Sequence, residues 1–122
     1  MSSIQPLYAS AELMARTTTY FAAHSDAKLD AVCAALQSHY SLPAFVDDWH
    51  DTWQYAFAKS PAIGVNVTKS EGTHTIETWM DGCPSGVNFQ IIADFEVEPD
   101  DLVTMLDSAL GATPVRYSTQ TA

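Results

Sequence analysis

The clearest hydrophobic pattern in the chain predicts a helix over residues 26–40. Apolar side chains recur there three or four residues apart, the spacing that places them on one face of a helix. These residues are Leu29, Val32, Cys33, Leu36 and Tyr40. Ser25 is a suitable N-cap, Asp26 favours the positive end of the helix dipole, and Leu42-Pro43 would end the helix.

A second helix is predicted over residues 99–110. Pro99 suits its first turn, Asp100 and Asp101 favour its N-terminal end, and Gly111 suits the position just after its last turn. The apolar residues expected on its inner face are Leu102, Met105, Leu106 and Leu110.

Several other segments are rich in β-branched and aromatic residues, or alternate between apolar and polar residues, as strands do. They are residues 16–23, 52–57, 63–68, 87–94 and 115–117. Because side chains alternate along a strand, Trp53, Tyr55 and Phe57 would share one side. We expect residues 87–94, with Phe89 and Ile91, to form a central strand.

Two segments allow either a strand or a helix. A helix that starts near Ser10 could continue through residues 16–23, although the Thr and aromatic content of that stretch suits a strand. Residues 73–80 could form a strand, which is slightly favoured, or a short helix capped by Thr73.

The order of these elements predicts an α+β fold. Strands that follow one another through short turns pair antiparallel, so we expect a two-layer sandwich with a mainly antiparallel sheet of four to five strands and two main helices. The 122 residues are 47% hydrophobic and suit a single domain with one core. Residues 1–9 and 118–122 are expected to be loose ends.

Charge narrows the range of partners. Fifteen Asp and Glu residues against five Lys and Arg leave a net charge of −10. Such a surface repels phosphate groups, so we expect neither direct nucleic-acid binding nor binding to anionic membranes. A basic protein would instead be steered towards it. Solubility alone is the competing explanation for the acidity.

The chain shows no signal peptide and no apolar run long enough to span a membrane. We therefore expect a cytoplasmic protein, in which Cys33 and Cys83 are reduced. Cys33 falls on the apolar face of the first helix, where a buried free thiol is ordinary.

The densest polar and aromatic stretch, residues 47–55, is the first candidate partner-binding site. We call it the acidic-aromatic segment. Its candidate residues are Asp47, Asp48, Trp49, Asp51, Trp53 and Tyr55. Trp and Tyr are frequent interface hot spots, and neighbouring acids could meet Lys or Arg. A metal site is not expected, because no second His- or Cys-rich segment completes the ligands. Core aromatics between solvated acids in a loop are the alternative.

A second acidic cluster precedes and enters the second helix. Its candidate residues are Asp94, Glu96, Glu98, Asp100 and Asp101. Some of these acids would serve the helix N-terminus, and a solvated edge is the plainer interpretation. If the cluster lies beside the acidic-aromatic segment in the fold, the two would form one negative surface.

No catalytic or cofactor-binding motif is found. Cys83 lies in a Gly-Cys-Pro turn, but no cation or His stands at a motif spacing that would activate its thiolate. The four His residues are scattered, and no glycine-rich phosphate loop or dinucleotide motif occurs. We expect neither catalysis nor a cofactor.

In size and charge, over the whole chain, the protein resembles the immunity proteins of bacterial polymorphic-toxin systems. The segments on which this general similarity to immunity proteins is noted are the acidic-aromatic segment and residues 65–68 and 83–89. The resemblance implies a protein that binds a toxin domain, possibly a nuclease, and neutralises it. The hypothesis is therefore a non-catalytic acidic binding module with a basic protein partner. Its alternatives are a self-associating scaffold or regulatory subunit, and a small ligand-binding domain or enzyme.

Overall fold

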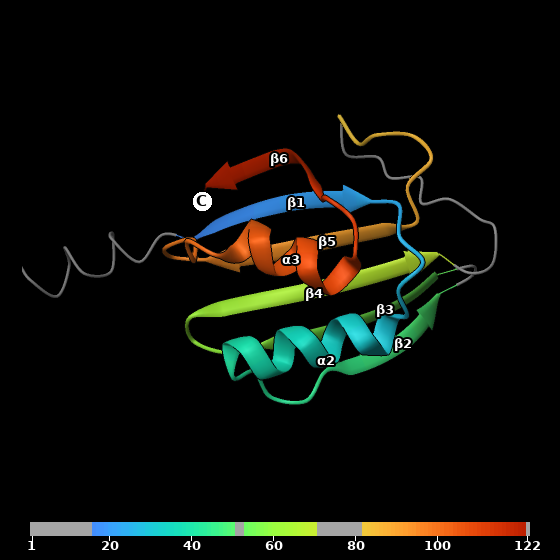
Figure 1. Cartoon of the computed structure of the whole chain (residues 1–122). Coiled ribbons are helices and arrows are strands. Elements are labelled where there is room, and N and C mark those ends of the chain that lie inside the picture. Colours follow the sequence, from blue (N-terminus) through green and yellow to red (C-terminus); the bar gives the residue numbers. More distant parts are fainter. Residues whose placement is uncertain (1–15, 51–52, 71–81, 122) are drawn as a thin grey trace, which may run out of the picture.

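The computed structural model describes residues 16–50, 53–70 and 82–121, with only the backbone described for Asp48, Trp49 and His50. Figure 1 shows the chain as a sheet with two helices in front of it. In chain order, the described elements are β1 Thr17–Ala23, α2 Leu29–Tyr40, β2 Val46–His50, β3 Trp53–Lys59, β4 Ile63–Ser70, β5 Phe89–Phe95, α3 Leu102–Leu110 and β6 Val115–Thr121.

The sheet has six strands in the order β2-β3-β4-β5-β1-β6, and every neighbouring pair is antiparallel. The predicted α+β two-layer fold is confirmed, with one strand more than the upper end of the expected range. The additional strand is β2, which lies within the acidic-aromatic segment. Adjacent aspartates have low strand propensity, but an edge strand that pairs with a single neighbour tolerates them.

One hydrophobic core lies between the helices and the sheet. Leu29, Val32 and Leu36 of α2 and Leu102, Leu106 and Leu110 of α3 pack there against the inner face of the sheet. From the strands, Phe21, Phe89 and Ile91 are completely buried. Since Ala56 and Ala58 also belong to this core, the alternate residues of β3 face away from the helices.

The strand predictions for residues 16–23, 52–57, 63–68 and 87–94 are confirmed by β1, β3, β4 and β5. The helical alternative is wrong for residues 17–23, and β5 lies in the interior of the sheet, as expected for a central strand. Residues 10–15 and the ambiguous segment 73–80 lie outside the described residues.

The predicted start of the first helix is wrong, because α2 begins at Leu29 rather than at residue 26. Lys28, not Ser25, occupies the N-cap position. Ser25 is buried, and its hydroxyl accepts the N–H of Ala27 and donates to the carbonyl of Leu110. A sequence pattern cannot reveal that this hydroxyl joins the end of α3 to the start of α2.

The C-terminal part of the chain also differs from its prediction. β6 runs to Thr121 and pairs along β1, so residues 118–121 are strand and not a loose end. α3 begins at Leu102 rather than at residue 99, because the Leu102 N–H bonds back to the Pro99 carbonyl in a turn that precedes the helix. Gly111 ends α3 with a φ of 66°, as its position predicts.

Candidate functional site

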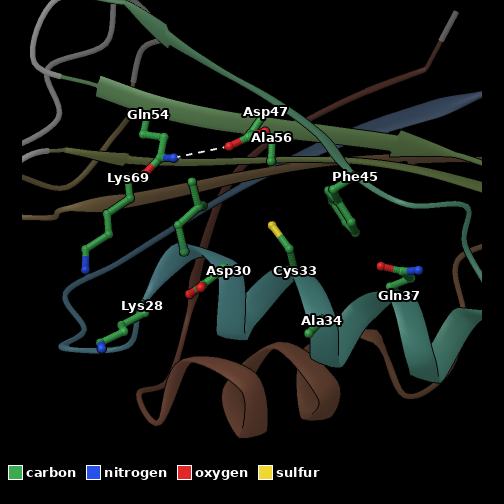
Figure 2. A pocket seen from close by; sticks show the side chains of 11 residues that line it. Lys28, Asp30, Cys33, Ala34, Gln37, Phe45, Asp47, Gln54, Ala56 and Lys69 are labelled. Atoms are coloured by element: carbon green, nitrogen blue, oxygen red, sulfur yellow. Dashed lines mark hydrogen bonds between the residues drawn. The ribbon is translucent and has the colours of Figure 1, made fainter.

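A cleft of about 570 Å³ lies between α2 and the β2–β3 edge of the sheet. Figure 2 shows its lining side chains, with α2 on one side and the strands on the other. Its lining residues are Lys28, Leu29, Asp30, Cys33, Ala34, Gln37, Phe45, Asp47, Gln54, Ala56 and Lys69. The volume falls within the range of about 300–1,000 Å³ that is usual for small-ligand pockets.

Small side chains line the cleft on both sides. Cys33 and Ala34 line it from α2, and Ala56 lines it from β3. α2 packs against β3 and β4, so the edge strand β2 extends beyond the cover of the helix. Phe45, which precedes β2, packs against the core and lines the cleft near Gln37 (Figure 2).

Two carboxylates flank the cleft from different elements. Asp30 belongs to α2, Asp47 belongs to β2, and both are exposed. Gln54 donates an amide hydrogen bond of 3.4 Å to Asp47 Oδ2, and neither carboxylate has an ion-pair partner among the described residues. Each therefore keeps its negative charge available to a cation that enters from solvent.

Two lysines lie together at one end of the cleft, at the start of α2 (Figure 2). Lys69 Nζ donates a 2.7 Å hydrogen bond to the Ala27 carbonyl and lies 5.4 Å from the centre of the Phe89 ring. Lys28 is exposed. The cleft is therefore polarised along its length, with ammonium groups at one end and carboxylates on its walls.

Cys33 forms part of the cleft as an uncharged thiol. Burial, and then the charges of Asp30 and Asp47, raise its pKa to about 11. Burial also raises the pKa of Cys83, although a hydrogen bond with Tyr117 acts in the opposite direction. Neither described environment activates a thiolate, because a nucleophilic cysteine needs its pKa lowered.

The structure distributes the acidic-aromatic segment over both faces of a hairpin. Asp47 lies at the cleft, while Trp53 and Tyr55 are half-buried on the face away from the helices. In the backbone register, Asp48 is opposite Tyr55 and Trp49 is opposite Gln54. Asp51 lies outside the described residues.

Three members of the second acidic cluster have partners within the protein. Asp94 pairs with Arg16 at 3.3 Å, and Glu98 binds both terminal nitrogens of Arg116. Asp101 is bonded to the side chains of two residues at the end of α2. Glu96 and Asp100 are exposed. Most of this cluster therefore ties neighbouring elements together.

Asp101 connects the start of α3 to the end of α2. The Tyr40 hydroxyl donates to Asp101 Oδ1 at 2.9 Å, and His39 Nε2 contacts Oδ2. The hydrogen bond from His39, followed by that from Tyr40, lowers the pKa of Asp101. These contacts give the carboxylate a structural role at the junction of the helices.

Within the described residues, the structure does not bring the acidic-aromatic segment and the second acidic cluster together. β3 and β4 lie between β2 and β5, and Asp47 shares the face of Ala56 whereas Asp94 faces the opposite side, between core residues Ala93 and Phe95. The acid that the structure does place with Asp47 is Asp30, which the sequence analysis missed. Its only signal is its position three and four residues before Cys33 and Ala34 on the same helix.

Among the described residues, no group of three or more His, Cys, Asp or Glu residues could hold a metal ion. No described helix has the length and apolar character needed to cross a membrane. Comparison of the chain with protein-family models, with curated proteins and with solved structures found no match.

Proposed function

We propose that this protein is a non-catalytic binding module of the immunity type, which recognises a basic protein partner through the cleft and the hairpin that forms its wall. The observation that supports the proposal most is the placement of Asp30 and Asp47 on different walls of one cleft, without ion-pair partners in the described part of the chain. Cations from a partner would satisfy both charges.

The physical basis is electrostatic steering followed by local desolvation. A net charge of −10 raises the rate at which a cationic protein encounters this one. Within the cleft, a cation close to two carboxylates gains more Coulomb energy than it would on an open surface, because less water screens the charges. Exposed acids elsewhere contribute to the encounter but little to the final affinity.

The proposed partner is a toxin domain that acts on a phosphate-containing substrate, such as a nuclease. An enzyme of that kind presents cations to its substrate, and an acidic protein can occupy the same surface. In this proposal the charges of Asp47, Asp48 and Asp51 steer the partner. Trp53 or Tyr55, on the face of the sheet away from the cleft, anchors a part of the partner that wraps around the β2 edge.

The test uses the protein encoded directly upstream of this chain's gene, since an immunity gene is expected immediately downstream of its toxin gene. Association and dissociation rates are measured across a salt series. Charge reversal at Asp47, Asp48 and Asp51 should slow association and flatten its salt dependence. Asp30→Asn combined with Asp47→Asn should mainly speed dissociation.

The matched control is Asp26→Asn combined with Asp100→Asn, which removes the same charge from exposed acids that do not line the cleft. If the purified upstream domain does not bind, the immunity proposal is wrong. If it binds but the cleft variant and the control behave alike, this face is not the interface.

A second candidate function is self-association through the β2 edge. Val46 and Phe57, which are opposite each other in β2 and β3, are 75% and 44% exposed. Large apolar side chains next to an edge strand favour strand pairing between chains. Light scattering over a wide concentration range tests this candidate, and a mass that stays monomeric throughout contradicts it.

A further inference from the structure

The cleft lies beside a strand whose outer edge is open. β2 pairs with β3, and no other strand pairs with it among the described residues. An edge strand presents backbone N–H and C=O groups that can pair with an added strand. The five residues of β2 are therefore a template directly next to a pocket.

A helix on one side and an edge strand on the other define a groove suited to an extended peptide. In this mode of recognition, main-chain hydrogen bonds to the edge strand supply affinity, and pockets for alternate side chains supply specificity. Here α2 forms the helical wall and β2 forms the edge, and the cleft occupies the space between them (Figure 2).

We propose that an extended basic segment of the partner adds to β2 as a seventh strand and inserts an Arg or Lys side chain into the cleft between Asp30 and Asp47. This inference rests on the proposed function and specifies how the partner is held. The aliphatic stem of the inserted side chain packs on Ala34, Ala56 and Phe45, and its cationic end meets the carboxylates.

The charge distribution in the cleft selects where that cation comes to rest. Lys28 and Lys69 occupy the end at the start of α2 and repel a positive group there. Asp30 and Asp47 line the cleft between that end and Phe45 (Figure 2). The inserted head group therefore sits above Cys33, away from the lysines.

The opposite face of the hairpin determines the neighbouring positions of the peptide. Side chains alternate along an added strand, so residues flanking the inserted cation turn towards the face that carries Val46 and Phe57. Both of these side chains are apolar; Val46 is largely exposed and Phe57 is partly exposed. The peptide that fits best alternates a basic residue with an apolar residue.

A second copy of this chain is a poorer occupant of the same edge. Pairing β2 with β2 would bring two adjacent aspartates, Asp47 and Asp48, close to the same residues of the other copy. Like charges on paired strands are destabilising, and charged edge strands discourage self-pairing. A basic strand has the complementary charge.

The probe is a fluorescein-labelled peptide of about nine residues, a usual strand length, in which arginine and valine alternate and both ends are blocked. One control peptide carries citrulline in place of arginine, which removes the charge but keeps the shape. Another carries N-methyl groups on alternate backbone nitrogens, which removes hydrogen-bond donors along one edge. Binding is followed by fluorescence anisotropy and by the backbone amide NMR shifts of residues 46–50.

Two pairs of variants separate the cleft from general acidity. Ala34→Phe fills the cleft, whereas Ala31→Phe places the same side chain on an exposed position of α2 that does not line it. Asp30→Asn with Asp47→Asn is matched by Asp26→Asn with Asp100→Asn, two exposed acids outside the cleft. We expect the cleft variant of each pair to weaken peptide binding about tenfold relative to its control.

The inference holds if the arginine peptide shifts the β2 amides, both control peptides bind more weakly, and each cleft variant binds more weakly than its control. It is overturned if the arginine peptide does not bind up to about 1 mM, if backbone methylation has no effect, or if the members of each variant pair bind alike. Amide shifts of β2 that depend on protein concentration alone would identify a second copy as the occupant. If an upstream toxin domain binds but does not displace the peptide from β2, the proposed function stands and this inference is wrong.

Discussion

The space under α3 and the space beside α2 are filled differently. Leu102, Leu106 and Leu110 of α3 are at most 3% exposed and join Phe21 and Phe89 in the core. Beside α2, the small side chains of Cys33, Ala34 and Ala56 line a cleft of about 570 Å³. Both regions lie on the same face of one sheet, so side-chain size and the reach of the edge strand account for the difference.

The two regions serve different purposes: the space under α3 stabilises the fold, and the cleft beside α2 is open for binding. The free energy of unfolding falls when a side chain in a closely packed core is made smaller, because the remaining atoms do not close the gap. A cleft lined by small and polar side chains has little packing to lose and can accept an added group. We therefore expect substitutions under α3 to act on folding, and substitutions in the cleft to act on binding.

The largest expected effect is that of Leu106→Ala, which should lower the free energy of unfolding by about 2–5 kcal/mol. Leu106 is completely buried under α3. Ala34→Phe, at the exposed cleft position, should change it by less than about 0.5 kcal/mol. Urea unfolding followed by tryptophan fluorescence measures both values. Similar losses in the two variants would contradict the division between the regions.

Gly64→Ala should have the next largest effect, at the seam between β4 and β5. A Cβ atom there would clash with Asp94 Oδ1, so the carboxylate must move and its 3.3 Å contact with Arg16 weakens. We expect a loss of up to about 1 kcal/mol, because the displaced group is the end of a half-exposed side chain. The cost of Gly64→Ala should fall in an Asp94→Ala background. An equal cost in both backgrounds would show that the clash is not its cause.

A smaller effect is expected where the two helices meet at Asp101. Its hydrogen bonds lower its pKa from the ordinary 3.8, so its contribution to stability is present above that pH and is lost as the pH falls through the lower, folded-state value. Asp101→Asn should therefore reduce the difference in urea midpoint between neutral and acidic pH. The same pH dependence in wild type and variant would assign that difference to other carboxyl groups.

The last prediction concerns the reactivity of Cys33, where the expected change in stability is the smallest. With a pKa of about 11 instead of 9.0, Cys33 should alkylate with iodoacetamide at pH 8 roughly a hundredfold more slowly in the native protein than in urea. Cys83→Ser isolates its signal in mass spectrometry. Asp30→Asn with Asp47→Asn should raise the native rate modestly. Equal native and unfolded rates would mean that the cleft exposes the thiolate freely.

Periodicity was sufficient to predict most of the fold. The apolar spacing in residues 29–40 and 102–110 identifies both helices, because burial of one helical face is a local pattern. It does not identify β2, since Val46-Asp47-Asp48 has no strand pattern of its own and becomes a strand by pairing with β3. Ser25, the expected N-cap of the first helix, is likewise engaged by a distant group, because its hydroxyl donates to the Leu110 carbonyl.

The candidate site was predicted only in part. Asp47 was singled out from its acidic surroundings, but Asp30 is indistinguishable in sequence from any solvent-facing residue on a helix. What joins the two is the packing of α2 against β3 and β4, next to the edge strand β2, and this packing is not a local property of the sequence. The grouping of acids by sequence distance favoured residues 94–101, whose members Asp94 and Glu98 instead pair with Arg16 and Arg116.

The position of β1 has a consequence for how the chain acquires its structure. β1 lies between β5 and β6, so Thr17 is paired with Thr121 across 104 positions of sequence. The hairpins from β2 to β4 need only nearby residues, whereas β1 must wait for segments made much later. During synthesis, the hairpins that contain the proposed peptide-binding edge can therefore pair before β5 and β6, the two neighbours of β1, have been made.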